Sequence, residues 1–356
     1  MKIVVIGAGA AGILAAGKAA ETADEVVIIE KNDIIGKKLL ITGKGRCNIT
    51  NSADIEDMIG QYPRNAKFLY SALYTFTNDD IIRIIEENGV KTKVERGGRV
   101  FPVSDKSQDV VKALKKYALK PNVSLVHDTV KSLIISDGAV KGVKTSKTSI
   151  TADRVIICTG GKSYPRTGST GDGYKFAKQA GHTIIEPKAS LIPVLTEEKF
   201  VKDIMGLSLR NIKITAFNQK NKKVYSDFGE MLFTHFGISG PLALSLSSLI
   251  NRCDLKSVEL YLDLKPALDE GTLDKRLLRD FEKYKNKQLA NAMTDLLPQK
   301  MIGAVLSASG VSEKKSVNVL TKEERGMLIK TLKGFLMKPL SLRGFEEAII
   351  TSGGVA

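Results

Sequence analysis

The stretch MKIVVIGAGAAG, residues 1–12, decides the fold class because it joins an apolar run to a glycine-rich turn. A helical pattern follows over residues 13–20, and a second apolar run at residues 26–29 ends in Glu30. A strand, a G-x-G-x-x-G turn, a helix and a second strand that ends in an acid form the βαβ unit that binds dinucleotides. The sequence therefore predicts an α/β fold with a Rossmann-like nucleotide-binding domain.

Each glycine of this turn is required for a different physical reason. Gly7 permits the tight turn, Gly9 lets a pyrophosphate approach the backbone, and Gly12 lets the helix and strand pack closely. The N-terminus of the helix adds unpaired N–H groups and a positive dipole for the phosphates. Glu30 is placed to accept hydrogen bonds from both hydroxyls of a ribose, and it would repel a 2′-phosphate. These residues indicate FAD or NAD rather than NADP.

The composition is that of a globular protein, with 43% hydrophobic and 26% charged residues. No apolar run approaches the ~18 residues that a membrane span needs, so no membrane insertion is expected. Three widely spaced cysteines, Cys47, Cys158 and Cys253, fit neither a disulfide framework nor a zinc site. We therefore expect a cytoplasmic protein without a bound metal.

The net charge of +15 is unusual and is spread over both halves of the chain. Such a charge favours anionic partners, among them nucleotides, nucleic acid and anionic membrane surfaces. A lysine-rich surface that is kept soluble by self-repulsion explains the charge equally well.

The periodicity changes near residue 191. Before this point we expect a basic loop at 36–51, helices over 52–90 with Asn78 or Asp79 as a cap, strands over 90–103, and a helix over 105–119. A β-meander at 123–130, 133–136 and 140–145 precedes a buried strand at 154–158. Beyond residue 191 we expect strands at 206–235 and 258–264, helices at 272–284, 288–297, 299–308 and 321–337, and a returning strand at 340–350.

Several long motifs occur in one order along the chain: GAGAAG with Glu30-Lys31, TGKGRCNITN at 42–51, GGRVFPVSDKSQDVV at 97–111, CTGGKSYPRTGSTGDGY at 158–174 and GEMLFTHFGISGP at 229–241. Together they resemble the aminoacetone-oxidase/BaiN/YhiN-like family of FAD-dependent oxidoreductases, which belongs to the flavoproteins with two dinucleotide-binding domains. The resemblance runs from Met1 to Val355.

The resemblance implies an FAD-binding domain at 1–190 that returns at about 345–356, interrupted by a β-barrel-like insertion at 191–265 and a helical insertion at 266–340. Family members continue past a TSGGV-like segment into a stretch that closes the domain near the flavin ring. Because this sequence ends at Ala356, the resemblance implies that the adenine half of the site is present and that part of the isoalloxazine half is missing.

The resemblance also carries cofactor contacts onto this sequence. Gly7, Gly9, Ala11 and Gly12 would hold the pyrophosphate, Glu30 and Lys31 the adenosine, and Val130 the adenine through its backbone. Thr159, Gly160 and Gly161 match a second turn that approaches the cofactor. The loop at 36–51 would form the wall beside the flavin, where the contacts expected are Lys38, Gly45, Arg46 and Asn48.

Cys47 lies inside this loop and permits two interpretations. A cysteine is usually a small buried hydrophobic residue. Beside Arg46 and near a flavin, its thiol would instead act as a catalytic proton donor.

The chemistry implied is hydride transfer from NAD(P)H through FAD to an electron-poor C=C bond. Activities within the family include reduction of conjugated steroid double bonds, reduction of uracil to dihydrouridine in ribosomal RNA, and oxidation of small aminoketones. The charge of +15 favours an RNA substrate over a cationic aminoketone. Alternatives are an aminoketone oxidase, an RNA-binding protein with a vestigial flavin site, and an NAD-only dehydrogenase.

Overall fold

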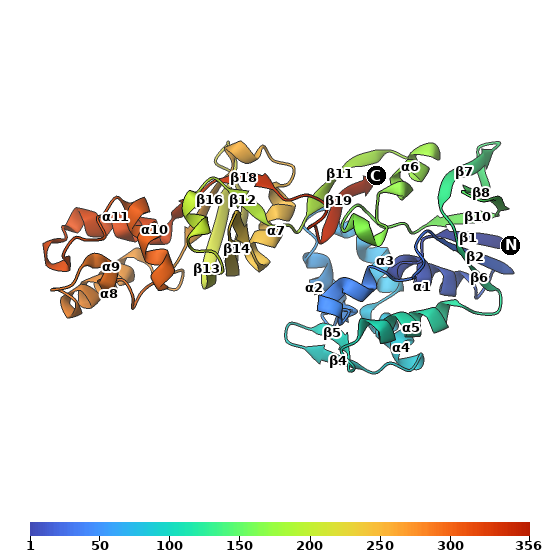
Figure 1. Cartoon of the computed structure of the whole chain (residues 1–356), viewed down its shortest axis with the longest axis horizontal. Coiled ribbons are helices and arrows are strands. Elements are labelled where there is room, and N and C mark those ends of the chain that lie inside the picture. Colours follow the sequence, from blue (N-terminus) through green and yellow to red (C-terminus); the bar gives the residue numbers. More distant parts are fainter. The chain divides into compact units, whose positions relative to one another are not determined.

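The computed structural model describes residues 1–356 and divides into two compact units (Figure 1). Unit 1 comprises Met1–Pro187 and Gly353–Ala356, and unit 2 comprises Lys188–Ser352. The chain leaves unit 1 within β11 (Ile184–Ser190) and returns within β19 (Ile350–Val355), and these strands form a two-stranded sheet. Both predicted insertions, 191–265 and 266–340, therefore fall within unit 2.

The central sheet of unit 1 is parallel, with the strand order β10-β1-β2-β6. Its apolar runs are continuous because both faces are covered. On one face Val5 and Ile28 pack in a core that includes α1 and α5, and on the other Val4 and Val27 pack against β7 and β8. The elements involved are β1 (Lys2–Ile6), α1 (Ala10–Ala19), β2 (Glu25–Glu30), α5 (Ser107–Ala118), β6 (Val123–His127) and β10 (Arg154–Ile157).

Two expectations about this sheet are corrected. The strand at 123–127 is not part of the meander, because it pairs with β2 along the full length from Val26 to Glu30. The meander contains β7 (Val130–Ser136), β8 (Ala139–Thr145) and β9 (Ser149–Thr151). The strand β10 is not buried but is an edge strand, and Ile157 at its end is 37% exposed.

The remaining elements of unit 1 surround this sheet. The N-cap of the helix α4 is Thr77 rather than Asn78 or Asp79, because Thr77 and Asp80 form a reciprocal capping box. A small sheet has the order β3-β5-β4. The bounds are η1 (Leu39–Gly45), β3 (Thr50–Asn51), α2 (Ile55–Gly60), η2 (Ala66–Leu69), α3 (Tyr70–Thr75), α4 (Asn78–Glu87), β4 (Thr92–Glu95), β5 (Arg99–Pro102), η3 (Pro165–Thr167) and α6 (Asp172–Gln179).

Unit 2 contains an antiparallel sheet of seven strands in the order β17-β16-β13-β14-β15-β12-β18. Its two edge strands, β17 (Phe335–Met337) and β18 (Pro339–Leu342), are joined by the single residue Lys338. The sheet must therefore curve until its edges meet at this residue, as a barrel-like sheet does. The other strands are β12 (Val194–Thr196), β13 (Ser208–Phe217), β14 (Lys223–Thr234), β15 (Gly237–Ser239) and β16 (Glu259–Asp263).

The helices of unit 2 share one hydrophobic core with this sheet. The helix expected over 321–337 ends at Lys333, because Gly334 leaves the helical conformation and the next residues form β17. The single strand expected over 340–350 is wrong, because β18 ends at Leu342 and β19 begins only at Ile350. The helices are η4 (Lys199–Lys202), α7 (Pro241–Ile250), η5 (Leu255–Ser257), α8 (Glu270–Lys283), α9 (Leu289–Ala292), α10 (Gln299–Ser309), η6 (Val317–Val319) and α11 (Lys322–Lys333).

None of the helices has the length and apolar content that crossing a lipid bilayer requires.

Candidate cofactor-binding site

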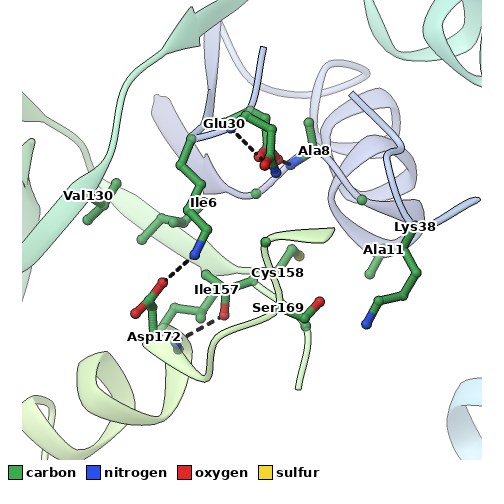
Figure 2. A pocket seen from close by; sticks show the side chains of 18 of the residues that line it. Ile6, Ala8, Ala11, Glu30, Lys38, Val130, Ile157, Cys158, Ser169 and Asp172 are labelled. Carbon is green, nitrogen blue, oxygen red and sulfur yellow. Dashed lines mark hydrogen bonds and ion pairs between the residues drawn. The ribbon is translucent and has the colours of Figure 1, made fainter. Parts of the chain in front are cut away.

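A cavity of about 590 Å³ opens in unit 1 at the carboxyl ends of β1, β2 and β10 (Figure 2). This is the edge at which open parallel sheets bind ligands. The volume lies in the range of about 300–1,000 Å³ that is usual for ligand and cofactor sites. The cavity is lined by nine of the residues predicted to contact the cofactor: Gly7, Gly9, Ala11, Glu30, Lys31, Lys38, Val130, Thr159 and Gly160.

The glycine turn of the cavity combines close packing with one open position. A Cβ on Gly7 would lie 2.6 Å from the carbonyl oxygen of Cys158, and a Cβ on Gly12 would lie 1.8 Å from the carbonyl oxygen of Gly7. A Cβ on Gly9 would meet no atom within 4 Å. Gly9 is also the N-cap of α1, so no side chain caps the first N–H groups of the helix. This arrangement fits a phosphate group above Gly9.

The Glu30 carboxylate is held at the wall of the cavity by backbone and side-chain donors. It accepts hydrogen bonds from the Ala8 N–H at 2.7 Å, the Asn32 N–H at 2.8 Å and the Asn32 side-chain amide at 2.6 Å. Figure 2 shows the carboxylate directed at Ala8. A carboxylate has about four acceptor sites, so these three donors orient it and leave capacity for a ribose hydroxyl.

Lys31 connects the end of β2 to the start of α6. Its Nζ donates to Thr170 Oγ1 and Asp172 Oδ2, both at 2.7 Å. The N-cap of α6 is Gly171, and the Asp172 carboxylate in the first turn takes part in the ion pair with Lys31. Burial raises the pKa of Asp172, but the hydrogen bonds from Lys31 and Thr170 and the charge of Lys31 outweigh burial, so the net pKa lies below the usual value. Lys31 therefore lies along the cavity as one partner of a half-buried ion pair.

Lys38 reaches the cavity from the basic loop. Its Nζ donates to the backbone oxygen of Ser163 at 2.7 Å and approaches Ser163 Oγ at 3.3 Å. Burial lowers the pKa of this ammonium group. Lys38 thus joins the loop at 36–51 to the segment that follows the second glycine turn.

That second turn packs against the beginning of α6. Thr159 Oγ1 accepts the Gly173 N–H at 3.0 Å. A Cβ on Gly160, whose φ is +73°, would lie 2.7 Å from Ser169 Oγ. Opposite this turn, Val130 is 8% exposed and lines the cavity beside Asp128 and Thr129.

The structure places the other predicted contacts outside the lining of the cavity: Gly12, Gly45, Arg46, Asn48 and Gly161. The Arg46 guanidinium donates to Glu95 at 2.8 Å and to Asp105 at 3.4 Å, and it lies 4.0 Å from the centre of the Phe101 ring. In the orientation that satisfies its amide, Asn48 donates to the carbonyl oxygens of Thr50 and Val100, at 3.0 and 3.3 Å.

Cys47 also lies outside the cavity lining and is 1% exposed. It is part of the core beneath α1 and α5. Burial raises the pKa of its thiol, and a hydrogen bond with Thr42 offsets part of that increase. The thiol is therefore protonated at neutral pH.

Sequence reasoning missed several residues of the cavity. Asn32 fixes Glu30, Cys158 packs beside Gly12, and Tyr174 contributes a half-buried ring. The turn GSTGDG at 168–173 was the available signal, because a backbone so rich in glycine before a helix indicates a close approach. The full set of missed lining residues in this region is Thr167, Gly168, Ser169, Asp172, Gly173, Tyr174, Phe176 and Ala177.

These features together fit a dinucleotide. The open position above Gly9 suits a pyrophosphate, Glu30 suits an adenosine ribose, and Val130 and Thr159 lie along the same cavity. The residues present would therefore hold the adenine half of FAD.

Comparison with known proteins agrees with this geometry. The model of the family described as HI0933-like protein Rossmann domain matches residues 1–356. The ribosomal RNA dihydrouridine synthase of Haemophilus influenzae is 30% identical over 99% of this chain and 85% of its own length. The protein of the same name from Escherichia coli is 28% identical over 99% of this chain and 84% of its own length. The 3-dehydro-bile acid Δ4,6-reductase of Clostridium scindens is 29% identical over 99% and 86%.

Solved structures match more distantly. Sdh1 from Mycobacterium smegmatis aligns with 58% of this chain and 45% of its own, at 20% identity and a TM-score of 0.43. The 3-ketosteroid Δ1-dehydrogenase from Sterolibacterium denitrificans aligns with 62% of each chain, at 14% identity and a TM-score of 0.42.

The family match covers every residue, and the glycine turn, Glu30 and the cavity supply the site that such a family needs. The chain belongs to the HI0933-like Rossmann family, and it is an FAD-dependent oxidoreductase.

Proposed function

We propose that this protein reduces an activated C=C bond with electrons from NAD(P)H, and that its substrate is uracil in ribosomal RNA. Two relatives are named as ribosomal RNA dihydrouridine synthases and a third as a bile acid Δ4,6-reductase. Dihydrouridine differs from uridine by one saturated C=C bond, and a Δ4,6-reductase also acts on conjugated double bonds. One reaction type therefore accounts for all three names.

The distribution of positive charge favours RNA over a small enone. The net charge is +15. In unit 1, a groove of about 550 Å³ between the end of α4 and α5 is lined by Lys91, Lys112 and Lys116, with Asp109 as its one acid. None of these three lysines takes part in an ion pair. Unpaired lysines along a groove suit a polyanion, because each phosphate neutralised releases counterions.

The chain's own residues would bind and orient the cofactor. Bound FAD supplies hydride transfer. The turn at Gly9 and the N-terminus of α1 would hold the pyrophosphate, Glu30 the ribose, and Val130 the adenine. Cys47 is the proton donor that the sequence suggested, but its thiol is buried in the core and outside the cavity lining, so this arrangement favours its packing role.

A small conjugated enone is the second candidate, favoured by the Clostridium scindens relative. The two candidates respond differently to salt. Turnover of an uncharged enone is insensitive to ionic strength, whereas RNA turnover falls steeply as salt is raised.

The test begins with an absorbance spectrum of the purified protein in the presence of FAD. Bands near ~370 and ~450 nm that bleach on addition of NADH or NADPH are expected for a functional flavin site. The reduced protein is then given unmodified ribosomal RNA transcribed in vitro, and dihydrouridine is measured by mass spectrometry. Bleaching without dihydrouridine, combined with turnover of an enone, would assign the second candidate instead.

A further inference from the structure

Residues 61–76, here called the aromatic segment, expose an unusual number of aromatic rings. The structure has seven exposed aromatic side chains, and five of them lie in this segment. The most exposed is Phe68, at 85%. The complete set is Tyr62, Phe68, Tyr70, Tyr74 and Phe76.

The rings are arranged before any partner binds. Tyr70 and Tyr74 are one turn apart on α3, and their rings stack at 6.1 Å with an angle of 8° between their planes. The Tyr74 hydroxyl donates to Glu56 on α2, which fixes the orientation of that ring. Phe68 precedes them in η2. The segment thus presents a stacked pair and a nearly free ring.

The charge of the segment selects a class of partner. No aspartate or glutamate occurs from Met58 to Asn78, whereas Arg64 and Lys67 lie among the rings. Lys67 forms no ion pair. Flat rings interleaved with cations are the usual surface for single-stranded nucleic acid, because bases stack on the rings and phosphates pair with the cations.

Hydrogen bonds of Asn78, just after the segment, hold its C-terminal end beside the basic loop of the candidate site. The segment follows β3 and α2, and α4 begins directly after it. The Asn78 side-chain amide donates to the carbonyl oxygens of Asn51 and Ala53, at 2.8 and 3.0 Å. Asn51 is the last residue of the loop at 36–51. The aromatic segment therefore belongs to unit 1, together with the cofactor cavity.

We propose that the aromatic segment binds single-stranded RNA, with bases stacked on Phe68 and on the Tyr70–Tyr74 pair and a phosphate at Lys67. This inference rests on the proposed function, and it identifies the surface that presents the substrate strand. A segment built in this way recognises unpaired nucleotides, because the bases of a duplex are already stacked on one another.

The test measures binding of a fluorescent 12-nucleotide oligouridylate and of an RNA duplex of equal length by anisotropy, with the full chain loaded with FAD. Phe68→Ala is expected to weaken oligouridylate binding about tenfold. Phe68→Tyr should restore the affinity and Phe68→Leu should not, because stacking requires a ring. Phe228→Ala is the matched control, since Phe228 is 56% exposed on β14 in unit 2. Bleaching of the flavin by NADH should be unchanged in every variant.

The outcomes separate this inference from the proposed function. Loss of binding in Phe68→Ala supports the surface even if no dihydrouridine forms, and in that case only the proposed function fails. Formation of dihydrouridine by Phe68→Ala at the wild-type rate, with unchanged binding, overturns the surface and leaves the proposed function standing. Wild-type protein that does not bind oligouridylate, but forms a dimer that Phe68→Ala abolishes, would also overturn the proposal. The rings would then belong to a protein–protein interface.

Discussion

Gly9 differs from its two neighbouring glycines in what a methyl group would meet. The space above it is open, and its φ of −82° is accessible to alanine. Gly9→Ala should therefore leave the thermal stability of the FAD-free protein unchanged while weakening FAD binding about tenfold or more, by about 1.4 kcal/mol. Titration of FAD into the purified variant, monitored by the fluorescence of the flavin, measures this loss.

Gly12→Ala provides the contrast. Its Cβ would lie 1.8 Å from the carbonyl oxygen of Gly7, so the helix must shift. We expect a loss of about 1–3 kcal/mol in the free energy of unfolding, as for other overpacked cores. Equal stabilities for the Gly9 and Gly12 variants would contradict this account of the turn.

Cys47→Ala separates the two interpretations of this residue. Because the thiol is buried outside the cavity lining, we expect the variant to keep uracil reduction and to lose part of its unfolding free energy. Steady-state turnover and urea unfolding measure the two effects. Loss of uracil reduction in a stable variant whose flavin NADH still bleaches would instead support Cys47 as the proton donor, with a thiol pKa that burial raises.

The Asp172 carboxylate predicts how the stability of the protein changes at acidic pH. Its folded pKa lies below the usual 3.8, so its contribution to stability is fully present above that value and is lost as the pH falls through the folded pKa. Wild-type protein should therefore lose part of its unfolding free energy below about pH 4, and Asp172→Asn should lack that part of the decline. Urea unfolding at pH 7 and at pH 3.5 compares the two proteins. A parallel decline in both would show that the ion pair with Lys31 contributes nothing.

At the scale of elements, Thr77 shows how local chemistry sets a boundary. Thr77→Ala removes one side of the capping box of α4 and should cost about 1 kcal/mol of stability. Thr75→Ala is the control, because Thr75 is exposed at the last residue of α3 and caps nothing. Chemical denaturation of both variants gives the comparison, and equal midpoints would contradict the capping role.

The elements also show what local patterns predict. The first βαβ unit was predictable because its glycines, apolar runs and acid all indicate one structure. The strand at 123–127 was assigned to the wrong sheet, because pairing with β2 depends on residues about a hundred positions away. The boundary between α11 and β17 was missed because an apolar run after Gly334 suits either helix or strand.

Some residues of the candidate site were likewise predictable from the sequence, and others were not. Residues fixed by the glycine turn could be placed from the sequence, since backbone geometry and motif spacing determine them together. Arg46 was expected at the flavin, yet Glu95 and Asp105, which are remote in sequence, bind its guanidinium. Asn32 gave no sequence signal, because its role is to orient Glu30 through bonds that only the fold creates.

At the scale of the whole molecule, the charge of +15 predicts strong salt dependence. The logarithm of the RNA affinity should fall linearly with the logarithm of the salt concentration. Replacing Lys112 and Lys116 by alanine should reduce that slope by about 1 for each lysine that contacts a phosphate. Lys256→Ala, an exposed and unpaired lysine of unit 2, is the control. An unchanged slope in the double variant would exclude the groove as a phosphate site.

The two connections between the units have a consequence for how such a chain is assembled. Unit 2 departs within β11 and returns within β19, and these strands are neighbours in one sheet. Neighbouring strands lie about 4.8 Å apart, so the ends of unit 2 are already close together. For unit 1, the insertion then acts as a loop with fixed ends, and the entropy of closing a loop grows only slowly with its length. A nucleotide-binding domain can accept a large insertion at such a point with little loss of its own stability.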